Sequence, residues 1–233
     1  MTSATRLYLS NDTSARAAGA GVLADAWAER PEVQLIRISS RGAFFLEPMV
    51  ERDSPEGRIA WFNVQPDDLP SILSCNGGTP VRSIPFLAHQ ARFTFANFGE
   101  TEPLALDEYQ ARGGLKGLEE AFRLTPDAII EELRQSQLRG RGGAAFPVWN
   151  KWKVAQQTRA SEKYVVANAD EGDAGTYCDR MILEGDPFRL LEGMLICARA
   201  IGASRGYVYC RQEYPAAAAT LRAAIHKADE AEL

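Results

Sequence analysis

The segment most suggestive of chemistry is a glycine-rich, basic stretch at residues 139–152, with the sequence RGRGGAAFPVWNKW. It opens with two arginines and three glycines in five positions: Arg139, Gly140, Arg141, Gly142 and Gly143. Glycine lets backbone N–H groups approach an anion closely, and a run of such groups forms a concave anion site. Lys151 adds a further positive charge. The stretch is therefore a candidate anion-binding loop. A solvated basic turn is the alternative interpretation, because the stretch matches neither the P-loop nor the G-x-G-x-x-G pattern.

Amide and acidic side chains cluster at the end of a strand expected at residues 163–170 (KYVVANAD). They are Asn168, Asp170, Glu171 and Asp173. In open α/β sheets, ligands bind at the carboxyl ends of the strands. An asparagine side chain both donates and accepts hydrogen bonds, which suits the polar edge of a flavin or nicotinamide ring. A solvated acidic loop is the alternative, and the position after a glycine-rich anion loop favours a functional role.

A second strand, expected at residues 206–214, also ends in aromatic and charged residues, among them Tyr209 and Glu213. These side chains form either a sheet edge or the wall of a ligand site, and spacing alone does not decide between them. The four cysteines (Cys75, Cys178, Cys197 and Cys210) include no C-x-x-C pair, and there are only two histidines. We therefore predict no metal site in this chain, since zinc and iron–sulfur sites need clustered thiolates or imidazoles.

Two α/β units are expected to position these residues. In the first, strands are expected at 6–9, 33–38, 44–51 and 58–64, a turn at 54–57, and helices at 13–29 and 66–74. This β-α-β-β-β-α order fits a small thioredoxin-like domain over residues 1–75. Residues 76–103 lack clean periodicity and are expected to be a connector that packs on the second domain.

The second unit is expected to span residues 104–233. Helices are expected at 107–123, 126–137, 187–201 and 215–232, around the two strands and a polar loop at 171–180. Alternating strands and helices indicate a largely parallel α/β sheet. The fold class is therefore α/β in both units.

Bulk properties exclude several classes of protein. The chain has 233 residues, 45% hydrophobic and 24% charged, with a net charge of −5. An acidic balance gives no reason to expect nucleic-acid or membrane binding. The N-terminus has no apolar run of signal-peptide length, and no stretch approaches the roughly 20 apolar residues of a membrane span. We therefore expect a cytoplasmic protein without a transmembrane segment.

Four ordered segments carry a family resemblance: LRGRGGAAFPVWNKW, VANADEGDAGTYCDR, DPFRLLEGMLICARAIGA and YVYCRQEYP. They resemble the FMN-binding, NAD(H)-oxidising subunit of respiratory complex I, the diaphorase subunits of NAD-reducing hydrogenases and the beta subunit of NAD-dependent formate dehydrogenases. The resemblance covers about residues 104–233. The motif EGDPF at 184–188 most resembles the formate dehydrogenase branch. Residues 1–75 also resemble the thioredoxin-like domain of that branch.

The resemblance implies a role for each site residue. Gly140, Arg141, Gly142, Gly143 and Lys151 would bind FMN, Phe146 would stack on the nicotinamide side, Asn168 and Asp170 would hydrogen-bond the flavin, and Tyr209 and Glu213 would complete the wall. Glu171 and Asp173 would face the flavin and the nucleotide as catalytic residues. The implied reaction is hydride transfer between NAD(H) and FMN, with electrons exchanged with iron–sulfur clusters. The implied partners are iron–sulfur and molybdenum-containing subunits, and the alternative assembly is a complex I-like or hydrogenase-linked one.

Several features depart from the family pattern. Ala145 replaces a glycine, Val148 and Trp149 replace Thr-Gly, and Gln212 replaces a small residue. No cysteine precedes Cys75, so a 2Fe–2S cluster in the first domain is not expected. The family's flavin domain continues further and is followed by a domain that holds a 4Fe–4S cluster, whose ligands this chain lacks. The flavin domain is thus expected to be incomplete, and a truncated, non-catalytic assembly module is a third hypothesis.

Overall fold

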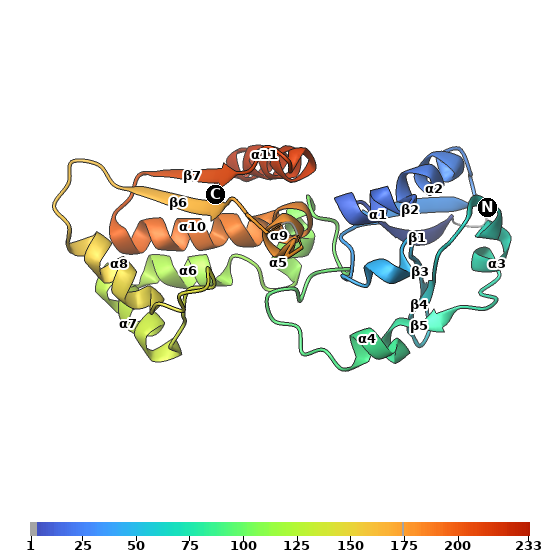
Figure 1. Cartoon of the computed structure of the whole chain (residues 1–233), viewed down its shortest axis with the longest axis horizontal. Coiled ribbons are helices and arrows are strands. Elements are labelled where there is room, and N and C mark those ends of the chain that lie inside the picture. The colour runs from blue at the N-terminus through green and yellow to red at the C-terminus, as the bar shows by residue number, and fades with distance from the viewer. Residues whose placement is uncertain (1–3, 174) are drawn as a thin grey trace.

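The computed structural model describes residues 4–173 and 175–233 and has two α/β parts joined by a long connector (Figure 1). The N-terminal part carries a five-stranded sheet, and the C-terminal part carries a two-stranded sheet flanked by helices. The mixed α/β class expected from the sequence is confirmed. In the described part of the chain, no helix has the length and apolar character that crossing a membrane requires.

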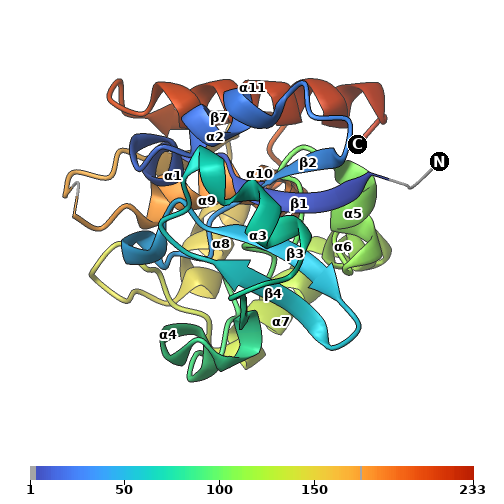
Figure 2. The same cartoon turned by 90° about the vertical axis from the view of Figure 1, so that its right-hand side faces the viewer.

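The N-terminal sheet faces the viewer in Figure 2. Its strands are β1 (Thr5–Ser10), β2 (Val33–Ile38), β3 (Val50–Ser54), β4 (Gly57–Trp61) and β5 (Thr79–Pro80), in the order β2-β1-β3-β4-β5. The β1 and β2 strands pair in parallel, and the remaining neighbours are antiparallel. The connecting helices are α1 (Thr13–Ala17), α2 (Ala20–Trp27), the 3-10 turn Pro66–Asp68 and α3 (Leu69–Leu73). Alternate apolar residues such as Leu7, Leu9 and Val50 point into one core together with Trp27 and Ile72.

Two expectations for this part were wrong. Residues 44–51 are not one strand: Phe44–Leu46 is a 3-10 turn, and β3 begins only at Val50. Pro48 interrupts the apolar run because proline has no N–H to donate to a sheet ladder. Residues 13–29 are not one helix either, since Gly19 adopts a left-handed φ of 109° between α1 and α2.

The connector, residues 76–103, packs on both parts and not only on the second. It supplies β5 to the N-terminal sheet and then forms the 3-10 turn Val81–Ser83 and α4 (Pro85–Ala88). Its Phe98 is 2% exposed and lies where a side chain on Gly185 of the C-terminal part would collide with it. The packing of the connector therefore requires glycine at position 185.

A buried ion-pair network also joins the connector to the N-terminal sheet. The Arg41 guanidinium donates to both carboxylate oxygens of Glu51, at 2.6 and 2.9 Å, and to Glu100 at 2.7 Å. It also donates to the Gly99 carbonyl at 3.0 Å. Burial acts to lower the pKa of Arg41, but the two carboxylates together outweigh it and raise this pKa. Arg41 therefore stays charged and fixes Glu100 of the connector against the sheet.

The C-terminal part contains α5 (Leu106–Ala111), α6 (Lys116–Arg123), α7 (Pro126–Ser136), α8 (Val148–Gln157), β6 (Tyr164–Ala169), α9 (Cys178–Gly185), α10 (Pro187–Ile201), β7 (Arg205–Cys210) and α11 (Pro215–Glu230). The β6 and β7 strands pair in parallel, as the sequence predicted. Buried Val165 and Ala169 of β6 pack against α10 and α11, which cover one face of this sheet. The opposite face carries exposed Val166 and Tyr207.

Three boundaries in this part differ from the sequence expectation. The helix expected at 107–123 is broken between α5 and α6, where Gly113 has a φ of 95°. The strand expected to reach residue 214 ends at Cys210, and α9 begins inside the expected polar loop at Cys178. The left-handed Gly113 explains the break between α5 and α6, and hydrogen bonds to Glu171 satisfy the first N–H groups of α9.

The α9 helix joins the two parts. Glu184, near its end, accepts hydrogen bonds from the backbone N–H of Thr13 at 2.7 Å and from the Thr13 hydroxyl at 2.6 Å. Arg180 of α9 donates to the Ser14 hydroxyl at 2.5 Å. The Glu184 carboxylate therefore caps the first helix of the N-terminal part, where backbone N–H groups lack partners within the helix.

The buried Glu184 gives the first testable prediction. Burial raises the pKa of Glu184, nearby Asp12 adds to this effect, and the Thr13 hydrogen bonds oppose it. A carboxyl whose folded pKa is raised costs stability while ionised, and this cost disappears as the pH falls through the folded pKa towards the unfolded value. We therefore expect Glu184→Gln to become more stable relative to wild type, with a larger free energy of unfolding, as the pH rises through this window.

Urea unfolding of both proteins at several pH values measures this difference. An exposed Glu119→Gln variant on α6 controls for the loss of one negative charge. A Glu184→Gln difference that stays constant between about pH 4 and about pH 8 would contradict the prediction.

Candidate cofactor site

The glycine-rich segment forms an exposed loop that is closed at its base. Arg139 and Pro147 form an isolated antiparallel bridge, and the Gly140 N–H donates to the Phe146 carbonyl at 2.8 Å. The Arg139 guanidinium donates to the Ala145 carbonyl at 3.1 Å. Residues 140–146 between these contacts are exposed. The loop therefore presents its backbone to solvent on a fixed stem, as an anion site requires.

Two residues of the loop adopt left-handed backbone conformations. Gly143 has a φ of 102°, which glycine tolerates because it has no Cβ. Ala145 has a φ of 50°, which is uncommon for a residue with a side chain. A glycine, which the sequence resemblance implies at position 145, would adopt this conformation freely, whereas the present alanine carries backbone strain.

Phe146 and Lys151, the two predicted cofactor-binding residues that follow the glycines, are both exposed. Phe146 ends the loop with 44% of its surface exposed. Lys151 lies in the first turns of α8, which begins directly after Pro147. The ammonium group of Lys151 and the backbone of the loop are therefore both available to an anionic ligand.

The strand ends bring a second set of predicted residues together. Asn168 of β6 is the direct neighbour of Tyr209 of β7 in the parallel register. Both side chains are exposed, Tyr209 to 64%, and they share a face with Val166 and Tyr207. The Asn168 side-chain oxygen accepts a hydrogen bond from the Asp170 N–H at 3.0 Å, which fixes the amide at the end of the strand. The ends of the two strands therefore lie side by side.

The acidic residues beyond the strands divide into exposed and buried groups. Asp170 is exposed, and Asp173 is exposed with its carboxylate accepting from the Gly175 N–H at 2.9 Å. Glu213 is exposed and pairs with Arg211 at 3.0 Å. Glu171 differs, because only 7% of it is exposed and its carboxylate accepts hydrogen bonds from the first turn of α9. The structure therefore places Glu171 apart from the exposed members of the predicted set.

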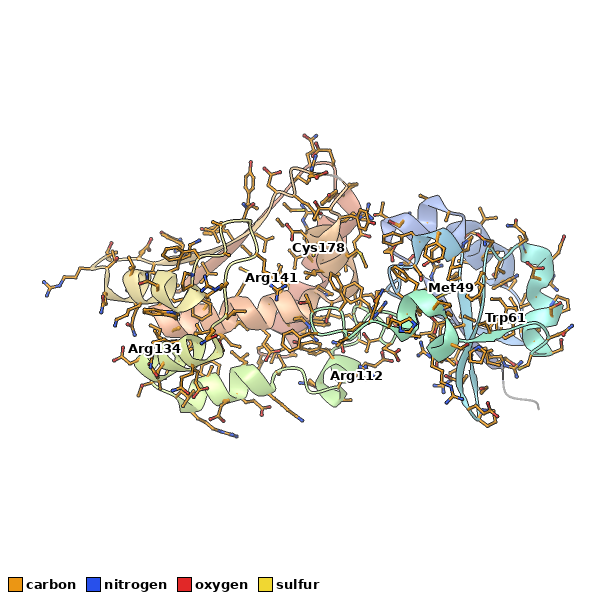
Figure 3. The ribbon with its side chains drawn as sticks, turned by 60° about the horizontal axis from the view of Figure 1, so that its bottom comes forward. Met49, Trp61, Arg112, Arg134, Arg141 and Cys178 are labelled. Atoms are coloured by element: carbon orange, nitrogen blue, oxygen red, sulfur yellow. The ribbon has the colours of Figure 1, made fainter. Side chains whose placement is uncertain are left out.

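Arg141 extends from the glycine-rich loop towards the connector. It lines a cavity of about 500 Å³ together with Arg92, Phe86 and Met181. Figure 3 shows Arg141 and Cys178 in the middle of the molecule, whereas Arg134 lies towards the far end of the C-terminal part. Burial raises the pKa of the Cys178 thiol, and the nearby charge of Arg141 opposes this effect. The Arg141 side chain therefore reaches the start of α9, where the backbone binds the carboxylate of Glu171.

Two residues that hold Glu171 in place were not predicted from the sequence. Tyr214 is buried and donates to Glu171 at 3.0 Å, and Arg211 donates to the Glu171 carbonyl. Their only signal in the sequence was the aromatic and charged composition of the second strand end. In the described ranges 4–173 and 175–233, no three His, Cys, Asp or Glu side chains gather in a way that could hold a metal ion.

The sequence of the C-terminal part is similar to that of known proteins. Residues 133–233 match the family described as Nuo51 FMN-binding domain. The chain is 45% identical over 141 residues to the NADP-reducing hydrogenase subunit HndC of Solidesulfovibrio fructosivorans, covering 60% of this chain and 29% of that protein. It is 48% identical over 124 residues to a subunit of the NADH-quinone oxidoreductase of Aquifex aeolicus, covering 53% of this chain and 29% of that protein.

One chain of a solved NAD+-reducing NiFe hydrogenase aligns with this protein at 24% sequence identity and a TM-score of 0.48. The alignment covers all of this chain and 42% of the hydrogenase chain, and the similarity is too distant to carry an inference. The chain spans less than a third of the length of the curated relatives it matches.

Proposed function

Because its C-terminal part belongs to the complex I flavoprotein family, we propose that this chain is the FMN- and NAD-binding portion of an NAD(H)-dependent electron-transfer complex. One observation carries the proposal. Arg141 of the exposed glycine-rich loop lines a cavity with Met181 of α9, and the first turn of α9 binds Glu171, which lies three residues after Asn168, the strand neighbour of Tyr209. This arrangement supports a site in which the loop binds a phosphate and the strand ends bind a ring.

The chemistry of these groups fits FMN. The backbone N–H groups of residues 141–143 and the charges of Arg141 and Lys151 suit a phosphate. The Asn168 amide suits the polar edge of the isoalloxazine ring, and Tyr209 offers an aromatic wall. The bound flavin would supply hydride acceptance from NADH and one-electron transfer onward. The protein's part is to bind and orient the two ring systems and to exclude water between them.

The identity of the parent complex is a finer proposal. The relatives named above are subunits of a hydrogenase and of an NADH-quinone oxidoreductase, which favours an assembly of that type with iron–sulfur partners. The motif EGDPF at 184–188 favours a formate dehydrogenase-type assembly with a molybdenum-containing subunit as the second candidate. Identification of the subunits that co-purify with this chain from its own cell decides between the two.

We also propose that the N-terminal part is thioredoxin-like. Its support is the sheet order β2-β1-β3-β4, in which β1 and β2 are parallel and a hairpin adds the antiparallel strands. A role as electron carrier does not follow, because residues 4–74 of the described chain contain no cysteine.

Reconstitution with FMN tests the proposed function. We expect the wild-type chain to bind FMN, with quenching of flavin fluorescence, and Lys151→Ala to weaken binding about tenfold through loss of a charged phosphate contact. Lys153→Ala is the matched control, because Lys153 lies on the same helix but near Glu131 of α7. The pKa of Glu131 is lowered mainly by Arg134 and, to a smaller extent, by the charge of Lys153.

A wild-type chain that takes up no FMN would refute the proposal and favour the non-catalytic assembly module. Equal losses of affinity in the two lysine variants would refute the role of Lys151 alone.

A further inference from the structure

We propose that Glu171 is a positioning residue, whose buried carboxylate holds the loop after β6 against α9 and thereby orients the exposed rim residues Asn168, Asp170 and Asp173. It neither touches the bound ring nor exchanges protons with it. This inference rests on the proposed FMN site and replaces the catalytic role that the sequence resemblance implied for Glu171.

The carboxylate of Glu171 binds the start of α9. One oxygen accepts from the backbone N–H groups of Cys178 at 2.6 Å and Asp179 at 3.0 Å. The other oxygen accepts from the N–H of Arg180 at 3.4 Å. These are N–H groups that an α-helix leaves without internal partners, and a negative charge near them is favoured by the helix dipole. Glu171 thus caps α9 from seven residues before its first residue.

The same residue is held by the segment that follows β7. The Tyr214 hydroxyl donates to the Glu171 carboxylate at 3.0 Å. Arg211 donates to the backbone carbonyl of Glu171 and is itself paired with Glu213. Burial and the hydrogen bond to Glu171 raise the pKa of Tyr214, so the phenol keeps the proton that it donates. Glu171 therefore links the ends of β6 and β7 as well as α9.

The geometry leaves Glu171 unsuited to contact a ring. Its two oxygens already receive four hydrogen bonds, and only 7% of the residue is exposed. Asp170 and Asp173, on either side of it, are exposed. A ligand could reach the Glu171 carboxylate only after the cap on α9 had opened, whereas the neighbouring aspartates are accessible without any rearrangement.

Variants of the full chain test the inference. We expect Glu171→Ala to raise the dissociation constant for FMN about tenfold and to shift the visible spectrum of the bound flavin, because the rim loses its fixed orientation. Glu171→Gln keeps an acceptor oxygen of the same reach and should recover binding to within about threefold of wild type. Tyr214→Phe should weaken binding about threefold, and adding it to Glu171→Ala should cause no further loss, because both act through one contact.

Hydrogen–deuterium exchange tests the cap itself, without FMN. The amides of Cys178, Asp179 and Arg180 should exchange faster in Glu171→Ala than in wild type and remain protected in Glu171→Gln. If Glu171→Ala does not fold, as judged by circular dichroism, the Gln and Phe variants decide alone.

Two results would overturn the inference. One is a folded Glu171→Ala protein, or a Tyr214→Phe protein, with wild-type FMN affinity and spectrum. The other is a Glu171→Gln protein that binds FMN normally but loses NADH oxidation about a hundredfold, which would assign Glu171 to the chemistry. Failure of the wild-type chain to bind FMN would instead refute the proposed function, and the exchange data would still report whether the cap exists.

Discussion

Replacement of Arg41 by alanine is expected to lower the free energy of unfolding by about 3–5 kcal/mol, the cost of removing one partner from a buried ion pair. Arg41 is 8% exposed and its main partner, Glu51, is 1% exposed. Without the guanidinium, Glu51 keeps only the longer contact to Arg58 at 3.3 Å, and Glu100 of the connector loses its ion pair with the N-terminal part. Urea-induced unfolding followed by tryptophan fluorescence measures the loss.

An exposed ion pair of the same sheet provides the control. Arg6 and Asp53 approach to 3.1 Å, but their side chains are 59% and 46% exposed. Solvent screens such a pair, so Arg6→Ala should cost no more than about 1 kcal/mol. Similar losses in the two variants would show that the Arg41 network does not hold the connector to the sheet in the way described.

The second large effect is expected in the glycine-rich loop, where Gly143→Ala should weaken FMN binding about tenfold while leaving the melting temperature nearly unchanged. The φ of 102° at Gly143 is unfavourable for any residue with a Cβ. The new methyl group would have no neighbour within 4 Å, so the loop can relax into another conformation without disturbing the core. That relaxation would remove the N–H arrangement on which the proposed phosphate contact depends.

Gly202→Ala tests whether strain alone explains such a loss. Gly202 ends α10 with a φ of 74° and likewise has open space at its Cβ position. This variant should lower the stability of the protein and leave FMN affinity as in wild type. The prediction for Gly143 fails if the two variants affect FMN binding equally.

Much of the architecture followed from local patterns. The strand expected at 33–38 has the bounds of β2, and the helix expected at 126–137 begins where α7 begins, at Pro126. The errors arose where one residue overruled a hydrophobic run, as Pro48 did before β3 and Gly19 did between α1 and α2. Periodicity reports which residues are apolar, but a missing N–H or a left-handed turn decides where an element stops.

The sequence likewise predicted only part of the arrangement of the candidate site. Strand position was enough to bring Asn168 and Tyr209 together, because parallel strands end at the same sheet edge. The different environments of Asp170 and Glu171 were not predictable, since both are acidic residues in one short loop. What separates them is contact with the backbone of α9 and with Tyr214, which lies 43 residues away in sequence.

The position of α9 has a mechanical consequence. The carboxylate of Glu171 binds the first turn of this eight-residue helix, while Glu184 near its other end holds the first helix of the N-terminal part. A hinge motion between the two parts must therefore either break the Thr13–Glu184 hydrogen bonds or pull α9 and the attached rim loop along with the N-terminal part. Domain orientation and rim geometry are thereby coupled, so a partner that clamps the N-terminal part would also stiffen the edge at which the cofactor is proposed to bind.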